Sequence, residues 1–183
     1  MPRVTEHVEP HGPLQTARHY IRELIYGSND GIITTFAVVA GVSGGGLTLR
    51  VVLIIGAANL LADALSMAVG NYLSIRSHES VLEAQGLPEQ ESYPFRHGAA
   101  TFLAFSVAGA VPLLPYMIAA LPFDRFACSL MLTLTALFAV GAARALVATM
   151  RWWRGGLEMF LLGAIVAGVA YGSGALVAWL IGE

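Results

Sequence analysis

An apolar stretch in the first half of the chain contains an aspartate with no basic residue nearby to pair with it. Asp63 lies within residues 51–73, and a helix of that length spans roughly 35 Å, enough to cross a bilayer. A carboxylate at such a depth is costly and usually faces a cavity, an ion or a proton path. Three more side chains share its helix face at spacings of four, namely Asn59, Met67 and Asn71. Two amides, a carboxylate and a thioether on one face are typical of a cation path.

A second acid, Asp30, is predicted to lie at the level of Met67. Asp30 follows Arg22 by eight residues and Met67 precedes Arg76 by nine, which places both roughly 12 Å below the cytosolic surface. The turn at 43–50 makes the two helices antiparallel neighbours. A carboxylate with a thioether suits a borderline divalent ion such as Fe²⁺, and is unlike a Ca²⁺ or Mg²⁺ site.

The predicted metal ligands are therefore Asp30, Met67, Asp63 and Asn59. Asp63 and Asp30 are also predicted to couple transport to protons, because burial favours the neutral form of an acid. Simpler interpretations stay open for each residue. Met67 could be core packing, Asp63 could bond to a neighbouring helix, and Asp30 could belong to a turn at 28–31, which would shorten the first span to about 31–47.

A further acidic set lies on the cytosolic side, between the second and third spans. Glu79 and Glu83 are one turn apart on a helical extension and could attract cations, although a solvated loop is the simpler interpretation. The same stretch contains Glu89, Glu91, His78 and His97. The histidines at positions 7, 11 and 19 show no ligand spacing, so no metal role is assigned to them.

The composition indicates an all-α integral membrane protein. The 183 residues are 56% hydrophobic and 12% charged, about half the charge of a soluble domain, with a mean hydropathy of +0.68. The predicted domains are a cytosolic arm at 1–20 and one five-span membrane domain at 21–183 with a short cytosolic loop at about 76–98. The spans are expected at about 21–42, 51–74, 99–120, 126–148 and 157–181, the third of them kinked or unwound by Pro112 and Pro115.

Arginine placement predicts the orientation. Eight arginines fall on the side of the N-terminus and two, Arg50 and Arg125, on the other, so the N-terminus is expected in the cytosol and Glu183 outside. The first twenty residues are polar, so no cleavable signal peptide is expected. The net charge of −2 and the absence of a basic patch exclude nucleic-acid binding.

Small residues recur at spacings of four and permit close helix packing. These small residues are expected either to allow packing within one chain or to form a homodimer, with the cation path at or near the dimer interface. The pairs are Gly27/Gly31, Gly41/Gly45, Gly163/Ala167 and Gly168/Gly172.

Several blocks of the sequence together resemble the vacuolar iron transporter family (the yeast Ca²⁺-sensitive cross-complementer type). They are RELIYGSNDG at 22–31 with TFAVVAG at 35–41, ANLLADALSM at 58–67 with GNYLS at 70–74, and FLAFS at 102–106 with VPLLPY at 111–116. The resemblance covers about residues 18–181.

The resemblance implies a five-span homodimer that moves Fe²⁺, and sometimes Mn²⁺, out of the cytosol by proton antiport. It implies metal binding by Asp30 and Met67, and a role for Glu23 near the cytosolic mouth, where Glu79 and Glu83 are expected from their own positions. It also implies that the metal is cargo, that no cofactor is needed, and that the membrane is the inner membrane of a prokaryote or a vacuolar-type membrane of a eukaryote. Many family members insert a long Glu-rich domain between spans two and three, where this chain has only about twenty residues, so this chain is similar to the short members.

Two other classes compete with a divalent-metal exporter. An intramembrane enzyme would need a nucleophile and base at one depth, and the spans contain no such set of His, Ser or Cys, so an enzyme is not expected. A membrane scaffold would explain the small residues but not two unpaired intramembrane acids. A metal transporter of different ion preference is a nearer alternative.

Overall fold

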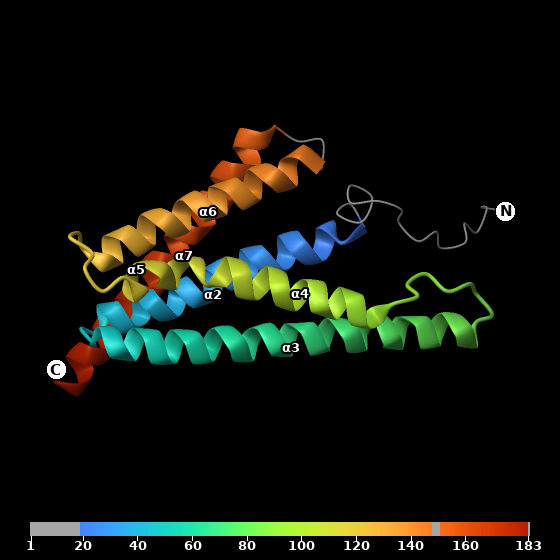
Figure 1. Ribbon diagram of the computed structural model, residues 1–183, viewed down its shortest axis with the longest axis horizontal. Coiled ribbons are helices and arrows are strands. Elements are labelled where there is room, and N and C mark those ends of the chain that lie inside the picture. The colour runs from blue at the N-terminus through green and yellow to red at the C-terminus, as the bar shows by residue number, and fades with distance from the viewer. Residues whose placement is uncertain (1–18, 148–150, 183) are drawn as a thin grey trace.

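The computed structural model describes residues 19–147 and 151–182, and within these ranges it is helical with no strands. The elements are α2 (Ile21–Gly44), α3 (Leu49–Ala84), α4 (Pro94–Gly109), the 3₁₀ turn η1 (Val111–Leu113), α5 (Leu114–Met117), α6 (Arg125–Val147) and α7 (Trp152–Ile181). The long helices run roughly along one axis (Figure 1). The all-α class is confirmed, while the arm predicted at 1–20 lies almost wholly outside the described residues.

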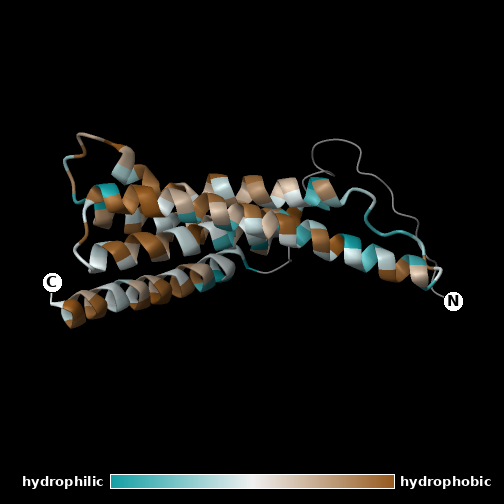
Figure 2. Cartoon of the chain, turned by 90° about the horizontal axis from the view of Figure 1, so that it is seen from below, coloured by the Kyte–Doolittle hydropathy of each residue, from teal (hydrophilic) through white to brown (hydrophobic). Residues whose placement is uncertain are grey.

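Four segments of the described chain are long and apolar enough to cross a membrane. They are Leu49–Ala84, Pro94–Met117, Arg125–Ala145 and Trp152–Ile181. Hydrophobic residues cover much of these helices, and polar residues gather where α3 projects from the bundle (Figure 2). The chain is thus an integral membrane protein. Helix α2 is long enough to span but less apolar than these four, so the count of five spans and the orientation stay predictions.

Helix α2 carries several polar side chains and packs against four other helices. It contacts α3, α4, α6 and α7, so side chains that would be costly in lipid can face protein. The predicted antiparallel pairing of the first two spans is confirmed, because α2 and α3 are joined by a turn at 45–48 and lie in contact.

The helix boundaries differ from the predicted spans mainly on one side of the molecule. Helix α3 continues to Ala84, well past the predicted end near residue 74, which confirms the helical extension that carries Glu79 and Glu83. Helix α4 begins at Pro94 instead of 99, because proline is well suited to the first turn of a helix. The predicted loop at about 76–98 is therefore largely helical.

The proline pair interrupts the third span as predicted. Helix α4 ends at Gly109, and Pro112 lies in the 3₁₀ turn that follows. The hydroxyl of Ser129 on α6 donates a 2.7 Å hydrogen bond to the carbonyl of Pro112. A neighbouring helix thus satisfies backbone that the irregular turn exposes.

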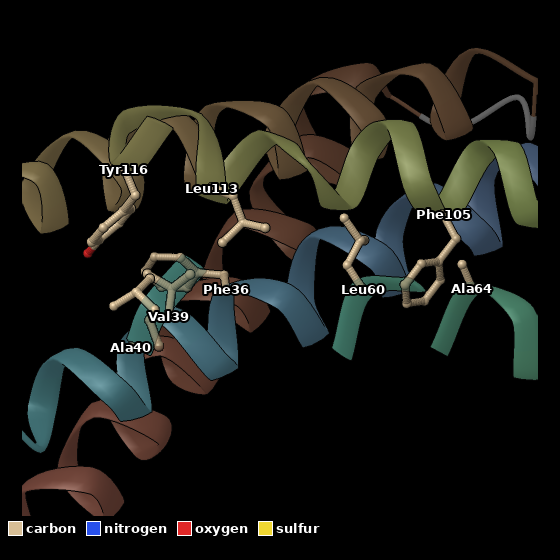
Figure 3. Packing of buried hydrophobic residues seen from close by; sticks show 10 residues of the cluster. Phe36, Val39, Ala40, Leu60, Ala64, Phe105, Leu113 and Tyr116 are labelled. Carbon is tan, nitrogen blue, oxygen red and sulfur yellow. The ribbon is translucent and has the colours of Figure 1, made fainter. Parts of the chain in front are cut away.

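The main hydrophobic cluster lies between α2, α3 and the segment from α4 to α5. Figure 3 shows Phe36, Val39 and Ala40 on α2 with Leu60, Ala64, Phe105, Leu113 and Tyr116 around them. The approach of α2 to α4 depends on glycine: a Cβ at Gly31 would lie 2.5 Å from the carbonyl oxygen of Phe105. Packing within the chain is thus the role of Gly31, whereas an added Cβ at Gly168 or Gly172 meets nothing within 4 Å.

Candidate functional site

A cavity of about 510 Å³ opens between α2, α3 and α4. It is lined by Arg22, Glu23, Tyr26, Met67, Gly70, Asn71, Ser74 and Thr101. Two of the predicted functional residues, Met67 and Glu23, therefore share one cavity although they come from different helices. The amide of Asn71 donates a 2.9 Å hydrogen bond to the hydroxyl of Thr101, which ties α3 to α4 beside this cavity.

The other predicted ligands, Asp30, Asn59 and Asp63, lie on the same two helices but do not line this cavity. The amide of Asn59 donates a 2.7 Å hydrogen bond to Oδ2 of Asp63, so these two residues form one polar unit on α3. Asp63 and Asp30 are both half-buried, and their carboxylates are near enough to interact electrostatically. The structure thus brings Asp30, Asn59 and Asp63 into one neighbourhood.

The interpretation of residues 28–31 as a turn is wrong. Helix α2 runs without a break from Ile21 to Gly44, and the hydroxyl of Thr34 donates to the carbonyl oxygen of Asp30 one turn earlier. The close contact of Gly31 with α4 explains why a glycine lies within this helix. Asp30 is therefore on a helix, which is the arrangement that the predicted ligand set requires.

Glu23 is almost completely buried, with 3% of its surface exposed. Its Oε1 atom accepts hydrogen bonds from the guanidinium of Arg22 at 2.8 Å and from Nδ1 of His97 at 3.1 Å. Its Oε2 atom is buried without a hydrogen-bond partner. A carboxylate oxygen left in this state is costly, so the site is suited to receive a cation.

The residues Glu79 and Glu83 lie apart from Glu23. They line a second, polar pocket of about 460 Å³ together with Glu89 and Glu91. The carboxylate of Glu79 accepts the backbone N–H groups of Gln90 and Glu91, at 3.1 and 2.9 Å. Glu79 therefore holds the α3–α4 loop in place, in addition to any role in attracting cations.

The sequence interpretation missed a buried histidine that connects these two regions. His97 is 2% exposed, so its assignment to a solvated loop is wrong. Its Nε2 atom lies 2.9 Å from Oε2 of Glu91, and Nε2 of His19 lies 3.5 Å from the same oxygen. The apolar run that follows His97 was the available signal, since it places this histidine in the first turn of α4.

Comparison with known proteins shows similarity along nearly the whole described chain. The model of the VIT family matches residues 21–92 and 83–175. A protein named Vacuolar iron transporter 1, from Arabidopsis thaliana, is 27% identical over 222 aligned positions, which cover 90% of this chain and 88% of that protein. Vacuolar iron transporter homolog 5, from Oryza sativa subsp. japonica, is 36% identical over 110 positions, which cover 55% of this chain and 53% of that protein.

Some of these relatives are longer than this chain. A protein named Vacuolar iron transporter, from Toxoplasma gondii, is 40% identical over 85 positions, and this chain spans only 28% of its length. The alignment with the Arabidopsis protein is longer than this chain itself, so that protein contains insertions that this chain lacks.

Proposed function

This chain belongs to the VIT family, and on that premise we propose that it exports divalent metal ions, Fe²⁺ foremost and Mn²⁺ as a second substrate, from the cytosol by proton antiport. The family is one of transporters, so the chain is a membrane transporter and not an enzyme, and the metal is its cargo and not a cofactor.

The shared cavity of Met67 and Glu23 is the observation that best supports a divalent metal path. A thioether and a carboxylate in one cavity offer a soft and a hard donor, which suits Fe²⁺ better than Ca²⁺ or Mg²⁺. Helix α2 supplies Glu23 and Asp30, and the surrounding helices shield it from lipid. We therefore include α2 as a fifth span and place the ion path along it.

The pair of acids further along the path supports proton coupling. Asp30 and Asp63 repel each other when both are charged, and either a proton or a metal ion relieves that repulsion. The proton and the metal ion compete for the same carboxylates. Binding of one therefore favours release of the other. Such competition is the basis of exchange between protons and metal ions.

A second copy of the chain would complete the path. Asp63 is only half-buried on α3, and the side chains of Ile55, Leu61 and Leu65 near it are exposed. A carboxylate beside lipid is costly, so we propose a homodimer that covers this face of α3. The membrane is of the vacuolar type in a eukaryote or the inner membrane in a prokaryote.

Reconstitution tests this function directly. Purified protein in liposomes with an internal metal dye and an internal pH dye is exposed in turn to Fe²⁺, Mn²⁺, Co²⁺, Zn²⁺ and Ca²⁺. We expect flux of Fe²⁺ above that of Mn²⁺, little flux of Ca²⁺, and proton movement opposite to the metal. Metal flux that ignores an imposed pH gradient would rule out antiport, and the absence of any metal flux would rule out the proposed function.

A further inference from the structure

Three potential metal ligands converge where the beginning of α2 meets the beginning of α4. His19, Glu91 and His97 each offer one ligand atom, and these atoms all lie within 4.8 Å of one another. The oxygen of Glu91 is 2.9 Å from the nearer imidazole and 3.5 Å from the other. Ligands bound to one metal ion at about 2.1 Å are roughly 3.0–3.4 Å apart, so small side-chain adjustments would admit an ion.

His97 is oriented as a metal-binding histidine usually is. Its Nδ1 atom lies 3.1 Å from the carboxylate of Glu23, and both side chains are 2% exposed. A metal-bound histidine commonly donates its second ring N–H to a carboxylate, which fixes the tautomer and the direction of the ring. With Nδ1–H donated to Glu23, the lone pair of Nε2 faces Glu91.

One oxygen of each of two carboxylates at this position lacks the hydrogen-bond partner that a buried oxygen requires. Oε2 of Glu91 and Oε2 of Glu23 are both buried and accept no hydrogen bond among the described residues. The 2.9 Å contact between Glu91 and His97 therefore brings the two atoms together without a well-directed hydrogen bond. A divalent ion between the imidazole and the carboxylate would satisfy this oxygen.

We propose that His19, Glu91 and His97 form a separate divalent-metal site, which captures an ion on the cytosolic side before the ion passes to the cavity that contains Met67. The proposal rests on the proposed function for the direction of transfer, but not for the binding itself. Two imidazoles and one carboxylate favour Fe²⁺, Co²⁺ or Zn²⁺ over Ca²⁺ and Mg²⁺. With three protein ligands, water would fill the remaining positions, as suits an ion that must leave again.

Glu23 connects the proposed site to the transport path. The same carboxylate contacts His97 and lines the cavity of Met67, so an ion released by the histidines is already beside the cavity wall. Glu91 in turn borders the pocket of Glu79 and Glu83. The site thus lies between an acidic surface pocket and the cavity between the helices, which is where a capture step would occur.

The test is a Co²⁺ titration of the purified full-length protein in detergent. Binding is measured from the visible absorption of the bound Co²⁺. It compares four proteins that all carry Met67→Leu and Asp30→Asn, so that two of the predicted membrane ligands are removed throughout. They are the parent, with these two substitutions alone, and the same protein with H19Q, H97Q or H78Q added. His78 is exposed on α3 and serves as the matched control. We expect at least tenfold weaker Co²⁺ binding in H19Q and H97Q, and binding within twofold of the parent in H78Q.

Co²⁺ binding within twofold of the parent in both H19Q and H97Q would overturn the proposal. If H97Q does not fold, H19Q decides alone, because His19 is only half-buried at the edge of α2. Absence of metal flux in liposomes would refute the proposed function and leave this binding result unaffected. Where flux is present, H19Q assayed without the two additional substitutions should raise the KM for metal with little change in kcat.

Discussion

The side-chain amide of Asn59 donates a 2.7 Å hydrogen bond to the carboxylate of Asp63, one turn further along the same helix. The carboxylate is thus held by a residue of its own helix. The amide donor carries no charge, so it satisfies a lone pair of the carboxylate without forming an ion pair.

Replacing Asp63 by asparagine should uncouple metal flux from protons. The variant retains the size and polarity of the side chain but can bind neither a proton nor a cation as a carboxylate does. In liposomes with paired metal and pH dyes, we expect only downhill metal movement and no opposing proton flux. Uphill accumulation at the parent's rate would show that Asp63 is a structural acid and that coupling depends on Asp30 or on the mouth residues Glu23, Glu79 and Glu83.

Asp30→Asn should abolish metal transport in a protein that still folds. The substitution keeps the volume and removes the charge that offsets dehydration of a divalent ion. Asp124→Asn is the matched control, since Asp124 caps α6 in an exposed loop and asparagine caps a helix equally well. Fe²⁺ flux into liposomes should be lost in the first variant and retained in the second, while equal flux in both would exclude Asp30 as a ligand.

Met67→Leu should change the ion preference more than the yield of folded protein. Leucine conserves volume, so the packing should lose less than about 1.5 kcal/mol. Loss of the thioether should reduce Fe²⁺ and Co²⁺ flux more than Mn²⁺ flux, because Mn²⁺ prefers oxygen ligands. Met131→Leu on the exposed surface of α6 controls for the loss of a sulfur. An unchanged ranking of the ions would show that Met67 only packs the core.

Gly31→Ala should destabilise the helical bundle, whereas Gly168→Ala should not. The new Cβ at Gly31 would lie 2.5 Å from the carbonyl oxygen of Phe105, so α2 and α4 must separate, at a cost of about 1–3 kcal/mol. At Gly168 nothing lies within 4 Å, and alanine improves helix propensity by about 1 kcal/mol. Thermal unfolding in detergent should show a lower midpoint for the first variant only. Equal midpoints would contradict the close packing of α2 and α4.

The helices themselves were predictable because hydrophobicity and helix signals are local. The composition identified the all-α membrane class, the second span was recognised around Asp63, and Pro112 indicated the break before α5. The helical extension of α3 past its apolar part was also predicted, from the one-turn spacing of Glu79 and Glu83. Helix α2 was recognised as a helix, but its place among four neighbours depends on contacts that no local pattern encodes.

The candidate site was easiest to predict where its residues share a helix. Asn59 and Asp63 are four residues apart, and their spacing alone indicated that they could interact. Glu23 and His97 are separated by 74 positions in sequence, and only the packing of α2 on α4 brings them together. The ligands Asp30, Asp63, Met67 and Asn59 stay predictions until metal binding is measured.

Helix α3 continues well past its apolar part, from Leu49 to Ala84. From Asp63 to Ala84 the helix continues without interruption over roughly 32 Å, and it contains no proline at which it could bend. If α3 tilts when a proton and a metal ion exchange at Asp63, the end of the helix that contains Glu79 and Glu83 would therefore move with it as a rigid body. A tilt of 5° would move that end by about 3 Å, comparable to the separation between two ligands of one metal ion. The binding of a cation or a proton at Asp63 and the width of the pocket lined by Glu79 and Glu83 would then change together.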